Sequence, residues 1–382
     1  MSNTNSLKPA MDLIYLVSCA VNGETTDRRT VSKMDLSAVQ KAALDHSFSV
    51  AAAYALEQVI KLPEELREEK YKAIRRLTLL NVERKKVLGA LEENKIPYLP
   101  LKGIVLKDYY PKTAMREMAD NDILFEKNKA EKVRDVMEGL GFTCKLYGKS
   151  HHDVYEKPPH IDFEMHRTLF DPDHEPEMCR YYEELPNRLI KNGEDSFGYH
   201  MTDEDFYIYL ICHLYMHYRE KGTGLRSLLD VYVFRKKIGA AFDTSYLERE
   251  FKKLDLDEFE RAMNELAQKV FTRQPLSEAE QSELKFFIDS KTHGTMDILM
   301  SRKLKNNDSA KSKAKYAIAR IFPTGDYLKR KHPFVYRHKA VYPFWILYRP
   351  IKGVVKHRKM MFNEIKRLKN FKAKENTGKF NK

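Results

Sequence analysis

The sequence predicts an α+β protein in which a mixed sheet core is flanked by N-terminal and C-terminal helical regions. Three observations lead to this prediction. Apolar residues recur at helical spacing through much of residues 1–90 and 171–300. Short apolar runs bounded by glycine and proline fill residues 91–170, which is typical of strands. One of these runs opens with two carboxylates, Asp120 and Asp122, and so gives the sheet a candidate chemical role.

The composition is that of a folded protein with more than one structural unit. Of its 382 residues, 42% are hydrophobic and 32% are charged. No apolar run approaches the roughly 18 residues that span a membrane, and the four cysteines lack zinc-knuckle spacing. We therefore expect a cytoplasmic protein. Its expected parts are a helical region (1–90), a sheet core (91–170), a helical domain (171–300) and a basic aromatic segment (301–382).

The first part of the chain is expected to be helical. Asp12 precedes the apolar stretch Leu13–Val21, where a signal peptide would have positive charge, and no small-residue cleavage site is clear. The stretch is therefore interpreted as a core helix. Either Ser32 or Asp35 can cap a helix that continues to Ile60. A highly charged amphipathic helix then leads to the first strand.

The next part alternates strands and helices. An apolar strand at Ile96–Leu101 ends at a lysine and a glycine, and a short helix follows. A second strand then begins at the paired aspartates, and a helix at Lys129–Leu140 ends at Gly141. The remaining strands are expected at Thr143–Tyr147, Asp153–Glu156 and His160–Arg167.

Carboxylates occur two apart on two of these strands. Because side chains alternate along a strand, Asp120 and Asp122 should project together, as should Asp162 and Glu164. Two carboxylates on one strand and a third from its neighbour can hold two hard cations about 4 Å apart, an arrangement that serves phosphoryl or nucleotidyl transfer. The alternative is that these are ordinary surface or capping carboxylates.

Four short motifs occur in a recognisable order. They are Leu101-Lys102-Gly103, Arg116 to Leu124 (REMADNDIL), Gly141-Phe142 and Glu164-Met165-His166. Together they resemble a bacterial family of uncharacterised nucleotidyltransferases within the DNA polymerase beta superfamily, closely over residues 80–170 and more weakly beyond. The resemblance implies the nucleotidyltransferase fold, an NTP such as ATP as substrate, and Mg²⁺ or Mn²⁺ as cofactor. It assigns the metal to Asp120, Asp122 and Glu164, with Asp162 as a further ligand.

The resemblance also assigns roles around the phosphates. Lys102 and Gly103 stand where the wider superfamily has Gly-Ser at a helix start, and a glycine still lets backbone N–H groups approach a phosphate. Arg116 would neutralise phosphate charge. His166, on the carboxylate face, would bond Glu164 or the acceptor. The exchanged Gly-Ser element leaves open a non-catalytic nucleotide-binding module.

Two further pairs lie on helices of the third part. His213 and His217 are four apart in the helix that begins near Asp203, and they suit core or substrate-side hydrogen bonds better than a metal site, because no third ligand is evident. Arg226 and Asp230 are also four apart. They either form an ion pair within the helix or place Arg226 in the site.

The basic residues are concentrated at the end of the chain. Residues 301–382 contain 24 Lys and Arg and 4 Asp and Glu, a net charge of +20, whereas residues 1–300 carry −7. Aromatic residues lie among these charges, and a basic amphipathic helix is expected from Val354. Such a segment suits an anionic membrane surface or RNA. The alternative is that it folds against the acidic body.

The sequence therefore predicts metal-dependent nucleotidyl transfer from an NTP, with the acceptor undetermined. A small molecule or cell-surface glycan precursor would suit a protein at the membrane periphery. An RNA end or a protein side chain would suit a toxin-like enzyme.

Truncation before Val354 is expected to weaken binding to anionic liposomes, because each Lys or Arg near such a membrane contributes about 1 kcal/mol. Binding by the full chain should also fall steeply with salt, since charges are screened within about 10 Å at 0.1 M. Liposome sedimentation with anionic and neutral vesicles measures both effects. A full chain that binds neither anionic liposomes nor RNA at low salt would show that the segment has another role.

Overall fold

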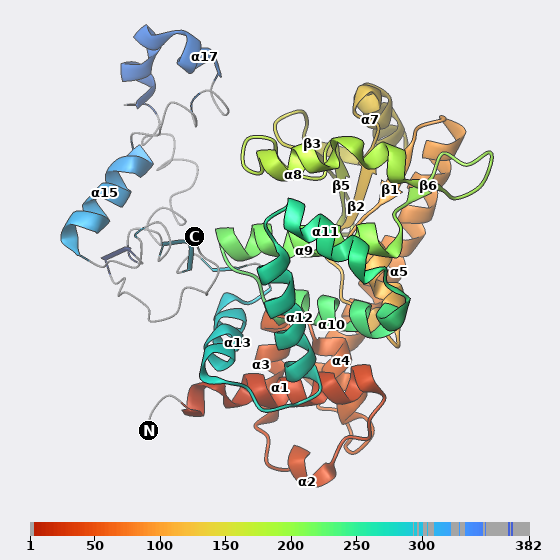
Figure 1. The fold of residues 1–382 in the computed structure, drawn as a ribbon, viewed down its shortest axis with the longest axis vertical. Coiled ribbons are helices and arrows are strands. Elements are labelled where there is room, and N and C mark those ends of the chain that lie inside the picture. The colour runs from red at the N-terminus through yellow and green to blue at the C-terminus, as the bar shows by residue number, and fades with distance from the viewer. Residues whose placement is uncertain are drawn as a thin grey trace.

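A five-stranded mixed sheet forms the core that the sequence predicted (Figure 1). The computed structural model describes residues 4–292, 294–295, 298–300, 304, 309–321, 328, 333–346, 348, 366 and 368–369. The strands are β1 (Tyr98–Pro100), β2 (Asn121–Phe125), β3 (Thr143–Leu146), β4 (His152–Lys157) and β5 (Ile161–His166). Their order is β1-β2-β5-β4-β3. Only the β2–β5 pairing within this sheet is parallel; the other neighbours are antiparallel.

The register of β2 and β5 positions the carboxylates. Asp122 lies opposite Glu164, and Leu124 lies opposite His166. Because neighbouring strands are about 4.8 Å apart, side chains on the same face at these positions are close enough to interact. On the other side of β5, His152 of β4 is paired with His166.

Two helices cover the apolar face of the sheet. They are α5 (Glu64–Glu93) and α7 (Ala130–Gly139), and α7 lies above the sheet in Figure 1. The buried side chains in this layer are Leu77, Leu80, Val87, Leu91, Val133 and Met137 from the helices, and Ile123, Phe125, Phe163 and Met165 from the strands. Full burial of each such side chain contributes about 1.5–3 kcal/mol. This layer therefore turns the polar residues of β2 and β5 to the opposite face.

The N-terminal helices differ from the prediction at one turn. They are α1 (Thr4–Asn22), α2 (Arg28–Val31), α3 (Leu36–His46) and α4 (Ser49–Leu56). Asp35 caps α3 by accepting the Ala38 N–H at 3.0 Å. The predicted continuous helix to Ile60 is wrong, because Ser47 adopts a left-handed conformation with φ of 58°. The turn allows Phe48 and the alanines of α4 to be completely buried in the hydrophobic core.

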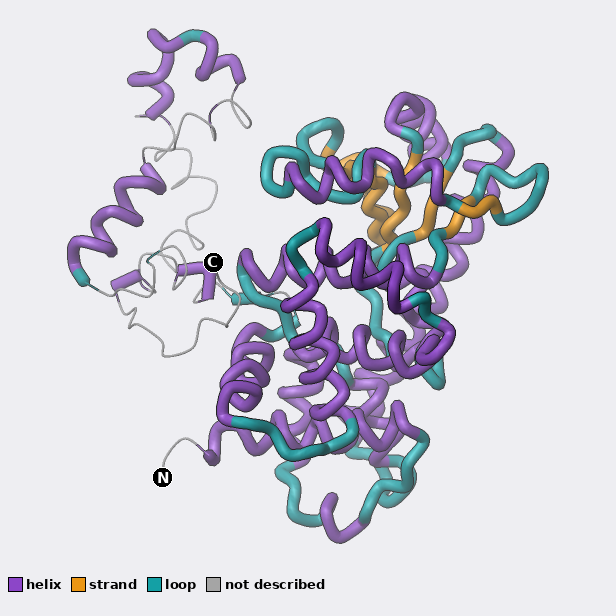
Figure 2. Tube along the Cα trace, viewed as in Figure 1, coloured by secondary structure: helices purple, strands orange, loops and turns teal. Residues whose placement is uncertain are grey.

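A second helical group surrounds the polar face of the sheet and extends the core. Its elements are α8 (Pro176–Tyr181), α9 (Asp203–Glu220), α10 (Leu225–Ile238), α11 (Thr244–Lys253), α12 (Asp257–Phe271) and α13 (Glu278–Ser290), with a 3-10 helix η4 (Tyr182–Arg188) and a short hairpin, β6 (Ile190–Lys191) and β7 (Tyr199–His200). Residues of α1, α4, α10 and α12 belong to one hydrophobic cluster. The described strands gather at one end of the body in Figure 2, and the rest of the described body consists of helices joined by loops.

The basic segment is described only in part. Helices α15 (Ala310–Ile321) and α17 (Pro333–Arg337) lie away from the helical body in Figure 1. Large side chains are exposed here, including Phe344 and Tyr348 at 74% and 56%. Most of the basic helix expected from Val354 lies outside the described residues. Among the residues that are described, no helix has the length and apolarity needed to cross a membrane.

A buried ion pair joins the loop before β2 to α10. Arg116 Nε lies 2.7 Å from Asp230 Oδ1, and both side chains are less than 10% exposed. Tyr110 donates its hydroxyl to the same oxygen at 2.6 Å. The pair with Arg116 replaces the intrahelical pair that the sequence allowed between Arg226 and Asp230.

The substitution Asp230→Asn is expected to lower the free energy of unfolding by about 3–5 kcal/mol, because it leaves the Arg116 charge buried without a counterion. Glu138→Gln is the control, since its partner Arg134 is 47% exposed and such surface pairs contribute at most about 1 kcal/mol. Urea denaturation measures both values. Equal losses in the two variants would contradict this account of the ion pair.

Candidate active site

A cavity of about 360 Å³ lies between the polar face of the sheet and helices α9 and α10. Its lining from the sheet side includes Lys102, Gly103, Arg116, Met118, Asp120, Asp122 and Glu164, and from the helical side Tyr209, His213, His217, Thr223, Arg226, Ser227 and Asp230. The cavity thus joins most of the predicted site residues, which are spread over more than 100 positions of the chain.

The closest cluster of possible ligands is formed by Asp122 and Glu164, which line the cavity, and by His166, which is buried next to them and does not line it. Each offers one ligand atom, and these atoms lie within 4.8 Å of one another. His166 Nε2 lies 2.9 Å from Asp122 Oδ1 and 3.5 Å from Glu164 Oε2. Burial lowers the pKa of His166, but its bonds to the two carboxylates raise it overall above 6.5. The register of β2 with β5 is what creates this cluster.

Lys102 balances the charge of the same carboxylates. Its Nζ lies 2.7 Å from Asp122 Oδ1 and 3.9 Å from Glu164 Oε2. Burial raises the pKa of Asp122, but Lys102 and His166 outweigh burial and hold that pKa well below its usual range. Lys102 also has a φ of 47°, an unfavourable backbone region for a residue with a Cβ. Such conformations are found at sites where the surrounding structure imposes them.

Asp120 experiences the opposite environment. Burial raises its pKa, and the charges of Asp122 and Glu164 raise it further, to about 7. Asp120 therefore holds its proton up to neutral pH unless a cation compensates the neighbouring charges. Asp120, Asp122 and Glu164 line the same part of the cavity, and this group of carboxylate oxygens is a donor set that fits a divalent cation.

One predicted metal ligand lies outside the cavity, and one predicted phosphate contact is already paired. Asp162 does not line the cavity; it is 38% exposed and lies 3.3 Å from Arg76, because it sits one alternation nearer the start of β5. Arg116 lines the cavity, but its guanidinium is paired with Asp230, so its charge is already compensated. Gly103 lines the cavity as expected, and a Cβ there would meet the Met118 side chain at 3.3 Å.

Arg226 is the arginine that faces the site. Its Nη1 donates to the Glu117 carbonyl at 3.3 Å, and its buried Nε has no hydrogen-bond partner among the described residues. Burial lowers the pKa of Arg226, and Arg116 lowers it further, to about 10. Its position next to the cavity matches the site-facing alternative for this residue.

Several lining residues were not predicted to belong to the site. Tyr209 comes from α9, Thr223 lies just before α10, and Ser227 lies in its first turn. His217 Nε2 lies 3.1 Å from His213 Nε2, so the predicted pair does share one side of its helix. The four-residue spacing of the histidines signalled this face of α9. The hydroxyls carried no comparable signal, because only the packing of α10 brings them to the cavity.

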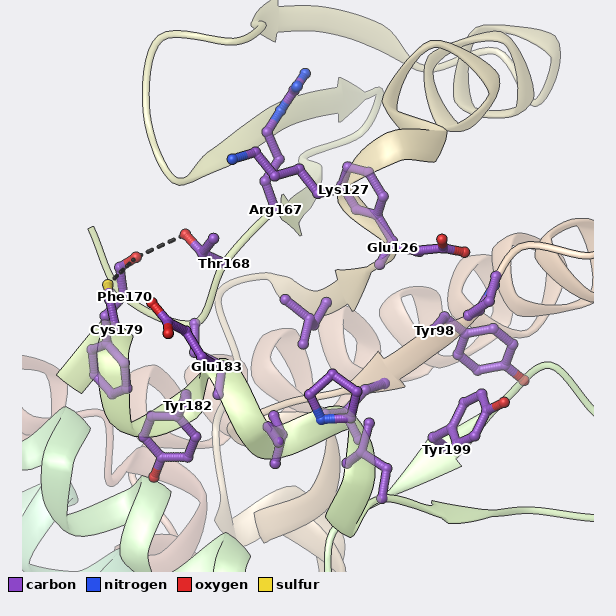
Figure 3. Close-up of a pocket in the computed structure, with 18 residues that line it drawn as sticks. Tyr98, Glu126, Lys127, Arg167, Thr168, Phe170, Cys179, Tyr182, Glu183 and Tyr199 are labelled. Atoms are coloured by element: carbon purple, nitrogen blue, oxygen red, sulfur yellow. Dashed lines mark hydrogen bonds between the residues drawn. The ribbon is translucent and has the colours of Figure 1, made fainter. Parts of the chain in front are cut away.

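A second cavity, of about 560 Å³, lies at the other end of β2 and β5 and is mainly apolar (Figure 3). Tyr98 and Tyr199 lie at one side of it, and Phe170 and Tyr182 at the other. None of the predicted site residues lines this cavity. The carboxylates therefore make the smaller cavity the candidate active site.

Comparison with known proteins identifies the family. Residues 32–272 match the family described as uncharacterised nucleotidyltransferase. The chain belongs to this family. The match spans helices α3 to α5, the sheet and helices α9 to α12, so the matched residues form the sheet side and the α9 and α10 side of the cavity. Neither a curated protein nor a solved structure matches the chain.

Membership confirms the predicted family and the α+β nucleotidyltransferase fold. It also supports nucleotidyl transfer in general, with an NTP as the substrate that the family implies. The roles of the individual residues, the metal and the acceptor stay predictions.

The raised pKa of Asp120 has a consequence for stability. Asp120 loses its proton near pH 4 in the unfolded chain but only near pH 7 in the folded protein, so between these values the folded protein holds one more proton. The stability contributed by this proton is fully present below pH 4 and is lost as the pH rises through 7. The free energy of unfolding of the parent should therefore fall between pH 5 and pH 8. With a chelator present, this fall should be smaller in Asp120→Asn than in the parent by about 2 kcal/mol.

Urea denaturation at the two pH values measures this difference, and comparing the falls cancels the effect of the substitution itself. Asp162→Asn, on the neighbouring strand but outside the cavity, is the control. A parent and an Asp120→Asn variant with the same fall would show that Asp120 ionises normally.

Proposed function

We propose that this protein is a metal-dependent nucleotidyltransferase whose reaction takes place at Asp120, Asp122 and Glu164. The observation that carries the proposal is the parallel pairing of β2 and β5, which sets Asp122 opposite Glu164 in the wall of a cavity. Family membership supplies the reaction class. The acceptor oxygen would attack the α-phosphorus of the NTP, the bond from that phosphorus to the bridging oxygen would break, and pyrophosphate would leave.

The carboxylates would hold the divalent cation. Asp120, Asp122 and Glu164 supply oxygen ligands, which Mg²⁺ and Mn²⁺ prefer. When bound, the cation supplies charge stabilisation to the phosphates and lowers the pKa of an acceptor hydroxyl. Glu164 is 28% exposed, the most accessible of the acidic side chains in the cluster with Asp122 and His166, and so suits the role of orienting the acceptor or accepting its proton.

The cationic groups would bind the phosphates. Lys102 lies beside Asp122 and Glu164, where a lysine can neutralise a phosphate that approaches the cation. From the opposite wall, Arg226 offers a guanidinium whose Nε is not engaged by another described residue. We therefore assign to Arg226 the phosphate contact that the sequence suggested for Arg116. Thr223 and Ser227, at the start of α10, are further polar contacts for the same groups.

The size of the cavity limits how the acceptor enters. Ligand cavities are about 300–1,000 Å³, so 360 Å³ suits one ligand of nucleotide size. A small acceptor would occupy the remaining edge of the cavity. An RNA or protein acceptor would present only its reactive end. We favour a small acceptor or glycan precursor, with His213 and His217 on the acceptor side.

A non-catalytic nucleotide-binding module is the second candidate, because the Lys102 ammonium group pairs with Asp122 at the position where a metal ion would otherwise bind. Incubation with Mg²⁺ or Mn²⁺ and each labelled NTP separates the two. An enzyme releases pyrophosphate or labels an acceptor, and a module binds the nucleotide without turnover.

Asp120→Asn, Asp122→Asn and Glu164→Gln are each expected to reduce NTP-dependent pyrophosphate release by at least about 100-fold, because each removes a metal ligand or the acceptor base. Asp162→Asn is the matched control on the same strand as Glu164, and it should stay within about threefold of the parent. The measurement is pyrophosphate release at saturating Mg²⁺, with circular dichroism to show that each variant is folded.

An inactive Asp162→Asn beside an active Glu164→Gln would reverse the assignment of the third carboxylate. Activity near that of the parent in both Asp120→Asn and Asp122→Asn would show that these residues do not form a metal site.

A further inference from the structure

Three histidines meet beside the carboxylate cluster, on the same face of the sheet and towards β4. They are His151, His152 and His166, and a ring nitrogen of each lies within 4.8 Å of the others. The antiparallel register pairs His152 directly with His166. Their ring centroids are 5.1 Å apart, and His151 lies 4.5 Å from His152 and 5.5 Å from His166. His151 and His152 do not line the candidate active site.

Each ring is oriented through one nitrogen. His151 Nδ1 lies 3.4 Å from the Ser150 hydroxyl, and His152 Nε2 lies 3.7 Å from a Glu164 oxygen. His166 Nε2 lies 2.9 Å from Asp122 Oδ1. A carboxylate or hydroxyl on one nitrogen is the usual arrangement for a metal-binding imidazole, because it presents the lone pair of the other nitrogen.

Within the described part of the chain, the second ring nitrogen of each histidine has either no hydrogen-bond partner or only another histidine nitrogen. His166 is 1% exposed, and its Nδ1 has no hydrogen-bond partner among the described residues. An unsatisfied buried polar atom costs about 1–3 kcal/mol. His151 Nε2 and His152 Nδ1 lie 3.2 Å from each other. Two ligands of a tetrahedral ion with Zn–N bonds of 2.0–2.1 Å are separated by about 3.3 Å, so this spacing already matches one edge of such a site.

We propose that His151 Nε2, His152 Nδ1 and His166 Nδ1 bind a divalent cation of the Zn²⁺, Co²⁺ or Ni²⁺ class. Imidazole nitrogen favours these ions, whereas Mg²⁺ prefers oxygen. Three protein ligands leave a position for water or a substrate atom. The site is separate from the oxygen site at Asp122 and Glu164, to which it is linked through the Asp122–His166 contact.

The inference does not depend on nucleotidyl transfer, because a protein without that activity would still present these three nitrogens.

Cobalt alone is the probe, because a tetrahedral Co²⁺ site has a visible absorption band. With excess Mg²⁺ to fill the oxygen site, the full chain should bind one Co²⁺ per molecule, measured by absorption and by titration calorimetry. His151→Gln/His152→Gln should weaken binding by more than the about 10–100-fold that loss of an outer-shell partner costs. The matched control is His160→Gln/His200→Gln, which removes two exposed histidines elsewhere and should bind as the parent does.

Circular dichroism verifies that the variants are folded, and the single variants His151→Gln and His152→Gln provide the same test if the double variant is not. Unchanged Co²⁺ affinity without these histidines would overturn the proposal. So would displacement of Co²⁺ from the parent by Mg²⁺, because the ion would then sit on Asp122 and Glu164. Pyrophosphate release is not a readout here, so failure of the proposed enzyme activity and failure of this site remain distinguishable.

Discussion

The parallel pairing of β2 with β5 is the constraint on which the rest of the structure depends. It sets Asp122 opposite Glu164 and turns both away from the apolar layer beneath α5 and α7. Moving either strand by one residue would turn its carboxylate into that layer and its core side chains into the cavity. The burial of Phe163 and its neighbours therefore holds the acidic side chains in place, although none of the apolar residues touches a substrate.

The electrostatics follow from this placement. Carboxylates that are close together in a partly buried wall repel each other, and Lys102 and His166 compensate mainly Asp122. Asp120 is left with too little compensation, and its pKa is raised to about 7. The difference between these two aspartates, which lie two residues apart on the same segment, comes from their neighbours rather than from their chemistry. A cation bound between them would remove that difference.

The helical wall completes the site and also determines which arginine side chain faces the cavity. Arg116 is engaged by Asp230, so it links the loop before β2 to α10 rather than facing a ligand. Arg226, one turn before Asp230, is thereby left facing the cavity. On the same face of the sheet, towards β4, the shared residue His166 connects the oxygen ligands with the histidine cluster. The two groups of ligands differ in chemistry and so select different ions.

The sequence by itself determined the strands, the sheet class, the family and the group of carboxylates, because period-two alternation and local motifs are properties of neighbouring residues. It did not determine the break at Ser47, which depends on burying Phe48 in the core. Strand alternation did not separate Asp162 from Glu164, since both share a face; the family resemblance favoured Glu164, and the position of α9 and α10 decides which one meets the cavity. Tertiary structure alone decided the partner of Asp230 and the meeting of His151 with His166, because these contacts join residues whose distance along the chain carries no local signal.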